Sequence, residues 1–361
     1  MSSSLLDPDW DSLGAECWND WKKSGDYLKQ DEEYRTPVAF DTETTGFGWF
    51  DELFCVTVAW RRPNGELASH YLEIESAASA NAAIARMILS EAHRLIGHNL
   101  RFDLQMVERK GIIAWDAMPV YKWEDTETIC HLLNENKRKG LKFVAEHLLG
   151  ETTNESKDLA AHRRHLGVKK DEGYHVLDRA VLMPYAIKDA EFTLRIWEKL
   201  HPVVAAEEEL LALYRREMKL MDVLATMYRS GMRVDKPALG EAIKAWSVRL
   251  LAAENAVREA GKDEGLNPSS PDQLLAAFKR CGVTTVTETN KDYLAPIAER
   301  DSEAGALARA ILEYRSVQKI YKTYLIGLRD EIGDEDVFHV NIRQNGAITG
   351  RTSSGAEKGD D

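Results

Sequence analysis

An apolar run near the N-terminus ends in two acids, in the stretch VAFDTETTGF at residues 38–47. Asp41 and Glu43 are separated only by Thr42. Because side chains alternate between the two faces of a β-strand, both carboxylates would project to the same side. Two unpaired carboxylates this close repel each other unless a cation lies between them, and oxygen ligands favour Mg²⁺ or Mn²⁺ over zinc. The spacing therefore favours a strand that ends in a cation site, although a turn capped by Asp41 explains DTET alone equally well.

The segments around these acids alternate between strand and helix patterns. Three β-like runs, TPVAFDTET, ELFCVTVAW and ASHYLEI, precede a helix over 81–94, the short strand RLIGHN and a second helix, LRFDLQMVERKG. Further helices are expected in TETICHLLNE, in LKFVAEHLLG and at roughly 180–200, with a charged, loop-rich insertion over 151–178. Residues 36–205 therefore predict an α/β domain behind a polar lead-in over 1–35.

The remainder of the chain is mostly helical. Long helices are expected over 207–230, 237–260 and 304–331, and two short helices follow cap signals in NPSSPDQLLAAFKRCG and TETNKDYLAPIAERD. A strand-like piece, VFHVNIRQ, then leads into a tail rich in Gly and Ser. These patterns predict a helical domain over 207–335 and an irregular, flexible C-terminal part over 336–361.

Composition is that of a soluble globular protein. Of the 361 residues, 44% are hydrophobic and 30% are charged, and no stretch approaches the roughly 20 apolar residues of a membrane span. The N-terminus has no signal-peptide pattern and the four cysteines are scattered, so we expect a cytoplasmic protein with reduced thiols. A net charge of −13 argues against a nucleic-acid partner unless the acids bind metal or basic residues cluster locally.

Two further stretches hold acids that can reach the first pair. In LIGHNLRFDLQM, Asp103 lies four residues after Asn99, one turn into a helix that starts at a strand end. Taken alone, Asn99 is better explained as a helix cap and Asp103 as a solvated acid. In YAIKDAEFTL, Tyr185 and Asp189 share one helix face, where a buried phenol and an exposed acid are the simpler explanation. Taken together, the stretches favour one shared acidic site.

The three stretches VAFDTETTGF, GHNLRFDLQM and YAIKDAEFTL resemble the motifs of the DEDD superfamily of 3′–5′ exonucleases, in the branch with Tyr in the third motif. The segment DTETICHLLNENKRKGLKFVAEHLLG is similar to that family's link between the second and third motifs. The resemblance covers about residues 36–200. It implies an RNase H-like α/β fold with a central mixed sheet.

The resemblance also implies a two-metal site at Asp41, Glu43, Asp103 and Asp189, with Mg²⁺ as the ion and Mn²⁺ as a substitute. Two ions roughly 3.5–4 Å apart would clamp the terminal phosphodiester. Asp41 would bridge both ions, and Glu43 and Asp189 would complete the site of the ion nearer the nucleophile. Asp103 would hold the other ion, partly through water. Tyr185 would stay protonated and orient the attacking water.

Other residues near these acids are candidate contacts to the substrate strand. Thr42, Thr44 and Asn99 flank the acids and offer backbone or side-chain polar groups to the 3′ nucleotide. Phe47 and Phe102 offer rings on which frayed bases can stack, with core packing an equal explanation for Phe102.

The helix RAILEYRSVQKIYKTYL carries a cluster of bases, Arg309, Arg315, Lys319 and Lys322. They favour contact with a phosphate backbone, although a solvated helix face is the simpler explanation. The texts GMRVD, NPSSPDQLLAAF, TETNKDYL, ILEYRSVQKIYKTYL and HVNIRQNGAITGRTSS resemble, in this order, the thumb and the start of the palm of family-A DNA polymerases over 207–354. This second resemblance implies that Thr349, Arg351 and Ser353 contact primer–template DNA.

The chain ends before the palm strands and the fingers of that family, so we expect no polymerase activity from it alone. A separate chain carrying palm and fingers is one explanation. The leading interpretation is the proofreading exonuclease and thumb of a phage-like family-A DNA polymerase, acting on a single-stranded 3′ end of DNA in a bacterial host. The alternatives are a stand-alone, ribonuclease D-like exonuclease, which the thumb-like text disfavours, and a non-catalytic DNA- or partner-binding module, which the complete set of acids disfavours.

Overall fold

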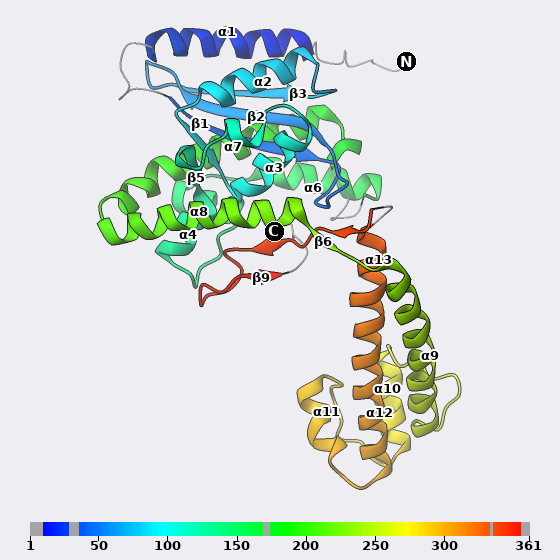
Figure 1. Cartoon of the computed structure of the whole chain (residues 1–361). Coiled ribbons are helices and arrows are strands. Elements are labelled where there is room, and N and C mark those ends of the chain that lie inside the picture. The colour runs from blue at the N-terminus through cyan, green and yellow to red at the C-terminus, as the bar shows by residue number, and fades with distance from the viewer. Residues whose placement is uncertain (1–9, 29–35, 169–173, 333–334, 355–361) are drawn as a thin grey trace, which may run out of the picture. The chain divides into compact units, whose positions relative to one another are not determined.

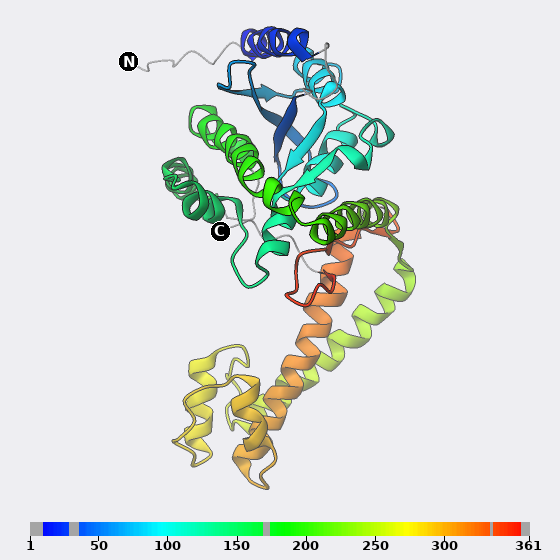
Figure 2. The same cartoon turned by 90° about the vertical axis from the view of Figure 1, so that its left-hand side faces the viewer.

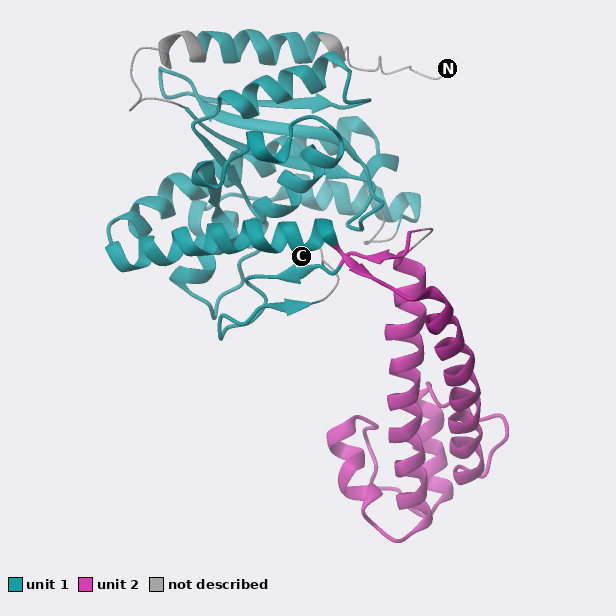
Figure 3. Cartoon of the chain, viewed as in Figure 1, with its two compact units in different colours: residues 1–230, 340–361 teal, residues 231–339 magenta. Residues whose placement is uncertain are grey.

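The computed structural model describes residues 10–28, 36–168, 174–332 and 335–354. The chain divides into two compact units, one formed by residues 1–230 and 340–361 and the other by residues 231–339 (Figure 3). Residue 207, where the helical domain was predicted to begin, lies inside the first unit because the helix over 208–230 packs into its core through Tyr214 and Met218. The predicted tail lies partly beyond the described residues.

A five-stranded mixed sheet forms the centre of the first unit (Figure 1). Its strands are β1 (Pro37–Thr44), β2 (Leu53–Arg61), β3 (Leu67–Glu73), β4 (Arg94–Gly97) and β5 (Trp123–Asp125). They are ordered β3-β2-β1-β4-β5. The pairs β1–β2 and β2–β3 are antiparallel, whereas β1–β4 and β4–β5 are parallel. The predicted central mixed sheet is therefore confirmed, and β1 is its middle strand.

Helices cover both faces of this sheet, and the first half of β1 is apolar and buried on both sides (Figure 2). Their bounds are α1 (Trp10–Leu28), α2 (Ala80–Glu91), α3 (Leu100–Arg109), α4 (Thr126–Leu133), α5 (Leu141–Val144), α6 (Asn154–Leu166), α7 (Arg179–Ala205) and α8 (Glu208–Ser230). Helix α7 packs through Ala190 and Leu194 on the face that carries Ala39. Helices α1, α2, α3 and α8 pack against the cluster around Val38 and Phe40 on the other face.

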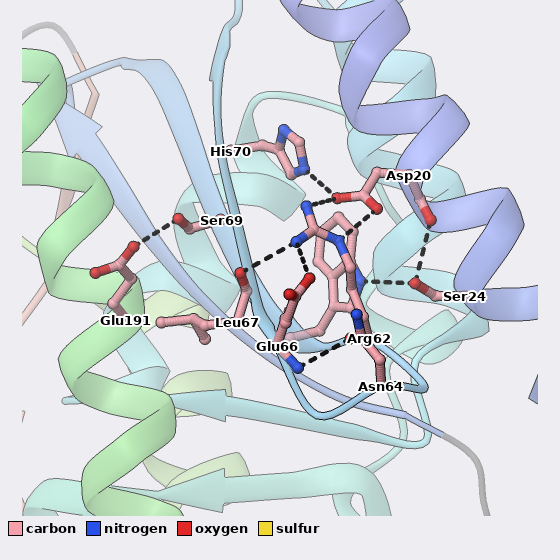
Figure 4. A network of polar contacts seen from close by, with 10 residues as sticks. Asp20, Ser24, Arg62, Asn64, Glu66, Leu67, Ser69, His70 and Glu191 are labelled. Carbon is pink, nitrogen blue, oxygen red and sulfur yellow. Dashed lines mark hydrogen bonds and ion pairs between the residues drawn. The ribbon is translucent and has the colours of Figure 1, made fainter.

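Helix α1, which lies in the polar lead-in, is anchored to the β2–β3 hairpin by a partly buried polar network (Figure 4). The Arg62 guanidinium donates two hydrogen bonds of 2.8 Å to the Asp20 carboxylate, and His70 Nε2 lies 2.9 Å from the same carboxylate. Trp60 Nε1 donates to Ser24 Oγ at 3.1 Å. The bond from Arg62 holds the pKa of Asp20 below its usual range. Helix α1 of the lead-in is therefore part of the first unit, and its Cys17 and Trp21 lie in the core.

The expectation of a loop-rich insertion over 151–178 is wrong over Asn154–Leu166, which form α6. The segment is charged and buries only Leu159, so its sequence lacks the repeat of apolar residues that would predict a helix. The helix ends at Gly167, whose φ of 71° suits the left-handed C-cap. Leu159 packs against Leu177 and Leu182 near the start of α7. This tertiary contact stabilises α6, which lacks an apolar face of its own.

The second unit is helical and closed by a short two-stranded ladder. Its elements are β6 (Met232–Arg233), α9 (Lys236–Ala260), α10 (Pro271–Arg280), α11 (Lys291–Ala298), α12 (Glu303–Gln318), a π-helical stretch (Lys319–Ile326), α13 (Gly327–Ile332) and β7 (Val337–Phe338). The predicted helices are confirmed, and the last is interrupted by the π-helical stretch. Leu274, Phe278 and Ile311 lie in a single core between these helices.

The chain then returns to the first unit, where β8 (Ile342–Arg343) pairs with β9 (Ser353–Ser354) in antiparallel fashion. All four cysteines are free. None of the helices in the described ranges is long and apolar enough to cross a membrane.

Candidate metal centre and nuclease site

Strand β1 delivers the first pair of acids. Asp41 pairs with Thr57 of β2 and Glu43 pairs with Cys55, so the two carboxylates lie two residues apart on one strand face. Ala39 is on the same face and packs against α7. The acids therefore extend the apolar face of β1 toward its carboxyl end, in front of α7, as the sequence spacing predicts.

Helix α7 supplies the third acid from the opposite side. Asp41, Glu43 and Asp189 each offer one carboxylate oxygen, and these three oxygens lie within 4.8 Å of one another. Tyr185 lies one turn before Asp189, and its ring contacts Tyr174 edge-on with centroids 5.8 Å apart. Three of the four predicted acids thus form one cluster, in which a single cation can contact all three.

Asp103 is placed beside this cluster by a different contact. It lies in the first turn of α3, is only 2% exposed, and accepts a hydrogen bond of 2.7 Å from the Thr42 hydroxyl. Thr42 lies between Asp41 and Glu43 in sequence, so its side chain points to the other face of β1. Because the Thr42 O–H already donates its hydrogen bond to Asp103, the hydroxyl can only accept a hydrogen bond from a substrate.

Burial and mutual repulsion dominate the electrostatics of the site. The pKa of Asp41 is raised well above its usual value, first by burial and then by the charges of Asp103 and Asp189. The pKa of Glu43 is raised by burial and by Asp189. Burial also raises the pKa of Asp189, against the lowering effect of Lys142. A bound cation would relieve this repulsion, and a purely carboxylate donor set fits a hard divalent cation.

The Tyr185 phenol stays neutral near pH 7. Burial is the main cause that raises its pKa well above the usual value, and the charge of Asp189 adds to it. A neutral phenol is a hydrogen-bond donor and not a base at this pH.

Lys142 is a member of the site that the motifs did not predict. Its ammonium contacts the Asp189 carboxylate, lies 3.8 Å from Glu155 Oε1, and sits 4.0 Å from the centroid of the Tyr185 ring. The residue comes from α5, in the stretch between the second and third motifs. In the sequence, Lys142 is only a basic residue within GLKF, and this pattern is too common to predict a site residue.

The acids lie in a cleft of about 780 Å³ within the first unit. Thr44, Asn99, Phe47 and Phe102 line it, as do the basic side chains Arg101, Arg138, Lys139, Lys142 and Arg343. The Phe47 and Phe102 rings contact each other with centroids 5.9 Å apart, and Phe47 is 40% exposed. The cleft therefore combines an acidic centre, basic side chains and an accessible aromatic pair.

Two smaller candidates beside the acids, Thr44 and Asn99, differ in their local contacts. The Thr44 hydroxyl donates to the Gly46 carbonyl at 2.7 Å and holds the turn after β1. Asn99 occupies the N-cap position of α3 with a φ of 67°, but its side chain makes no capping hydrogen bond. The Asp125 carboxylate instead accepts from the Leu100 N–H at 2.7 Å. The simpler explanation of Asn99 as a side-chain cap is therefore wrong.

The returning C-terminal segment forms one wall of the cleft. Arg101 donates to the Ile342 carbonyl at 2.9 Å and to Asn341 Oδ1 at 2.6 Å. The buried Asn345 amide donates to Thr128 Oγ1 at 3.0 Å. These contacts place residues 343–346 along the cleft.

The remaining predicted DNA contacts are not among the residues that line the cleft. Thr349 and Arg351 are exposed, and Ser353 is half-buried opposite Arg343 in the β8–β9 ladder. In the second unit, Lys319 and Lys322 are exposed. Arg315 is half-buried and donates to the Thr289 carbonyl and, at 3.1 Å, to its hydroxyl, so its guanidinium holds a loop of its own unit.

A mixed sheet flanked by helices, with clustered carboxylates at the end of its middle strand, defines the class of RNase H-like nuclease folds. Within that class, residues 19–205 match the family described as 3′–5′ exonuclease. The chain belongs to this family, and the predicted resemblance to family-A DNA polymerases is confirmed by its relatives.

Those relatives are bacterial and phage DNA polymerases. DNA polymerase I of Pseudomonas aeruginosa is 27% identical over 95% of this chain and 37% of its own length. DNA polymerase DpoZ of Salmonella phage PMBT28 is 27% identical over 90% of this chain and 53% of its own length. The DNA polymerase of Escherichia phage T5 is 25% identical over 88% of this chain and 39% of its own length. The chain thus spans between about a third and a half of these relatives.

One solved structure with a similar fold is the POL domain of Pol1 from M. smegmatis in complex with DNA primer-template and dNTP. It matches with a TM-score of 0.62 and 19% identity, covering 92% of this chain and 53% of that chain. The match supports the fold of the first and second units alike.

Proposed function

We propose that this chain removes nucleotides one at a time from the 3′ end of single-stranded DNA, as the proofreading part of a family-A DNA polymerase. The observation that carries the proposal is the convergence of Asp41, Glu43 and Asp189 within 4.8 Å, beside the neutral Tyr185 phenol. The relatives are DNA polymerases of bacteria and phages, which favours DNA as the substrate and a bacterial cytoplasm as the location.

Asp41, Glu43, Asp103 and Asp189 would hold two Mg²⁺ ions, with Mn²⁺ as a substitute. When bound, the ions stabilise the charge that develops on the attacking and leaving oxygens. The protein's own contribution is positional. Thr42 orients Asp103 through its 2.7 Å hydrogen bond, which keeps that carboxylate directed at the strand that carries Asp41.

Tyr185 would donate its phenol proton in a hydrogen bond to the attacking water or to the scissile phosphate. The raised pKa keeps that proton in place at neutral pH, so the phenol orients and does not deprotonate the nucleophile. Helix α7 fixes the distance between Tyr185 and Asp189, because residues four apart lie on one helix face.

The lining of the cleft offers groups that can bind an unpaired strand. The Phe47–Phe102 pair offers stacking faces for unpaired bases, and Thr44 and Asn99 line the same cleft and would contact the terminal nucleotide. The basic side chains Arg138, Lys139 and Arg343 offset the acids and can contact phosphates. Further phosphate contacts of primer–template DNA are proposed for Thr349, Arg351, Ser353, Arg315, Lys319 and Lys322.

The test is a timed digestion of a 5′-labelled single-stranded DNA oligonucleotide in Mg²⁺. Wild type is compared with Asp41→Ala, with an EDTA reaction, and with Asp116→Ala, which removes an exposed acid of the same unit and is the matched control. Stepwise shortening from the 3′ end by wild type and by Asp116→Ala, and by neither of the others, is expected. Shortening that persists in Asp41→Ala or EDTA would refute the assignment of the site.

Two added reactions separate the alternatives. An RNA oligonucleotide of the same sequence should be degraded more slowly, and a preference for RNA would favour a ribonuclease. A primed template with all four nucleotides should show no extension, because the described residues contain a single acidic group of metal-binding geometry. We propose that any extension by this polymerase requires palm and fingers supplied by further chain or by a partner.

A further inference from the structure

The Lys142 ammonium contacts a carboxylate that a metal ion in the acidic cluster would also bind. This carboxylate is that of Asp189, which belongs to the 4.8 Å cluster with Asp41 and Glu43. The side chains of Lys142 and Asp189 are only 15% and 8% exposed, so solvent screens this contact weakly. An ammonium and a divalent cation cannot both take the inner face of one carboxylate without repelling each other.

A second acceptor for this ammonium is already in place. Glu155 of α6 lies with its Oε1 atom 3.8 Å from Lys142 Nζ, and its side chain is 14% exposed. Within the described part of the chain, that buried oxygen makes no hydrogen bond. Buried carboxylate oxygens are normally hydrogen-bonded, so Glu155 has an unused acceptor directed at the lysine.

The Tyr185 ring also contacts this ammonium. Lys142 Nζ sits 4.0 Å from the centroid of that ring, and a cation over an aromatic face is held by the ring's negative surface. The ring therefore offers the ammonium an attractive contact in addition to Asp189 and Glu155, which lies 3.8 Å away. Four freely rotating carbons in the lysine side chain permit a movement from Asp189 to Glu155 without a backbone change.

We propose that Lys142 competes with the metal ion for Asp189, and that Glu155 receives the ammonium when the ion binds. This inference rests on the proposed function, since it takes the acidic cluster as the metal centre. Without the ion, Lys142 neutralises part of the cluster. With the ion, the Lys142–Glu155 pair keeps the charge away from the metal ligands and against Tyr185. Lys142 is thus a positioning residue that sets the metal concentration at which the enzyme works.

The test measures Mn²⁺ binding directly, by the loss of the free-ion signal in electron paramagnetic resonance. Lys142→Met is expected to bind Mn²⁺ about tenfold more tightly than wild type, because the ion no longer displaces a cation. Glu155→Gln is expected to bind it about threefold more weakly, because the displaced ammonium loses its charged acceptor. Lys199→Met is the matched control, since the Lys199 ammonium donates to the Leu148 carbonyl and lies on α7 ten residues beyond Asp189.

Opposite shifts in Lys142→Met and Glu155→Gln, with Lys199→Met unchanged, support the proposal. Unchanged or weaker binding by Lys142→Met overturns it. If thermal melting shows that Lys142→Met does not fold, Glu155→Gln decides alone, and unchanged or tighter binding by that variant is the refuting result. Asp41→Ala serves as the reference for the site itself: if it binds Mn²⁺ as wild type does, the metal centre of the proposed function is wrong and not merely its lysine.

An activity titration provides a second measure. The Mn²⁺ concentration that gives half-maximal digestion should fall about tenfold in Lys142→Met and rise in Glu155→Gln. A purely structural loss would lower the maximal rate and leave the half-maximal metal concentration where it is.

Discussion

Replacing Asp41 by Asn should make the first unit more stable when no divalent metal is present, although it should abolish nuclease activity. The reason is the crowding of three carboxylates on one site. Asn has nearly the shape of Asp, so the change removes a charge and leaves the packing between β1 and α7 intact. The site is then an example of a stability–activity trade-off.

The magnitude follows from the geometry. Carboxylate oxygens within 4.8 Å of one another repel by about 3 kcal/mol per pair at an effective dielectric constant of about 20. Asp41 takes part in two of the three pairs. Proton uptake and the Lys142 ammonium already relieve part of this repulsion, which leaves a net gain of about 1–3 kcal/mol for the variant. For a unit of this size, such a gain raises Tm by about 3–10 °C.

The gain should depend on pH in a defined direction. The folded-state pKa values of Asp41 and Glu43 are raised, so the folded protein binds more protons than the unfolded chain once the pH exceeds the unfolded value of about 4. Stability of the wild type therefore falls as pH rises through this window. Asn does not titrate, so the advantage of the variant grows above about pH 4 and vanishes below it.

The assay is thermal unfolding in EDTA, followed by tryptophan fluorescence at pH 4 and pH 8. Eight of the nine tryptophans lie in residues 1–230, so the signal reports mainly on the first unit. Asp116→Asn is the control. An Asp41→Asn protein that melts at or below the wild-type temperature at pH 8 would refute the reasoning, as would a gain of equal size at pH 4. Added Mg²⁺ should raise the wild-type Tm and leave the variant nearly unchanged.

Three other substitutions test separate parts of the structure. Tyr185→Phe should slow digestion about 10²-fold and leave Mn²⁺ binding unchanged, and a rate close to wild type would remove the phenol from the mechanism. Arg101→Ala removes two hydrogen bonds to residues 341–342, so the returning segment should lose about 2–3 kcal/mol of docking energy and be cut faster by protease, whereas an unchanged rate of cutting contradicts the contact. Phe278→Ala should destabilise the second unit by about 3–5 kcal/mol in a urea titration monitored by circular dichroism, and a loss below 1 kcal/mol would show that this core is not packed as described.

Local periodicity predicted the positions of the acids well. The two-residue repeat of β1 put Asp41 and Glu43 on one strand face, and the four-residue spacing of α7 put Tyr185 beside Asp189. Both rules depend only on near neighbours in the chain, and both agree with the observed register and helix. The mixed sheet could be predicted only from the resemblance to a known family. Periodicity does not give the order of strands, because that order depends on contacts between distant segments.

The features that sequence reasoning missed depend on long-range packing. Lys142 reaches Asp189 across 47 residues, and Arg101 reaches Asn341 across 240. Helix α6 has too few buried residues to show an apolar repeat, yet it supplies Glu155. The functional roles of the acids and of the DNA-contact candidates remain predictions, because side-chain position alone does not show what a group binds.

The ladder between β6 and β7 holds the start and the end of the second unit side by side. The chain leaves the first unit after Ser230 and returns at Val340, and Met232 and Phe338 are direct partners across that ladder. The two connecting segments therefore lie about one strand spacing apart, ~5 Å, at Met232 and Phe338. The second unit is an insertion within the sequence of the first unit. A linker of two or three residues could replace it without stretching the backbone. The nuclease half could then be produced as a minimal enzyme that keeps its own cleft wall from residues 340–354.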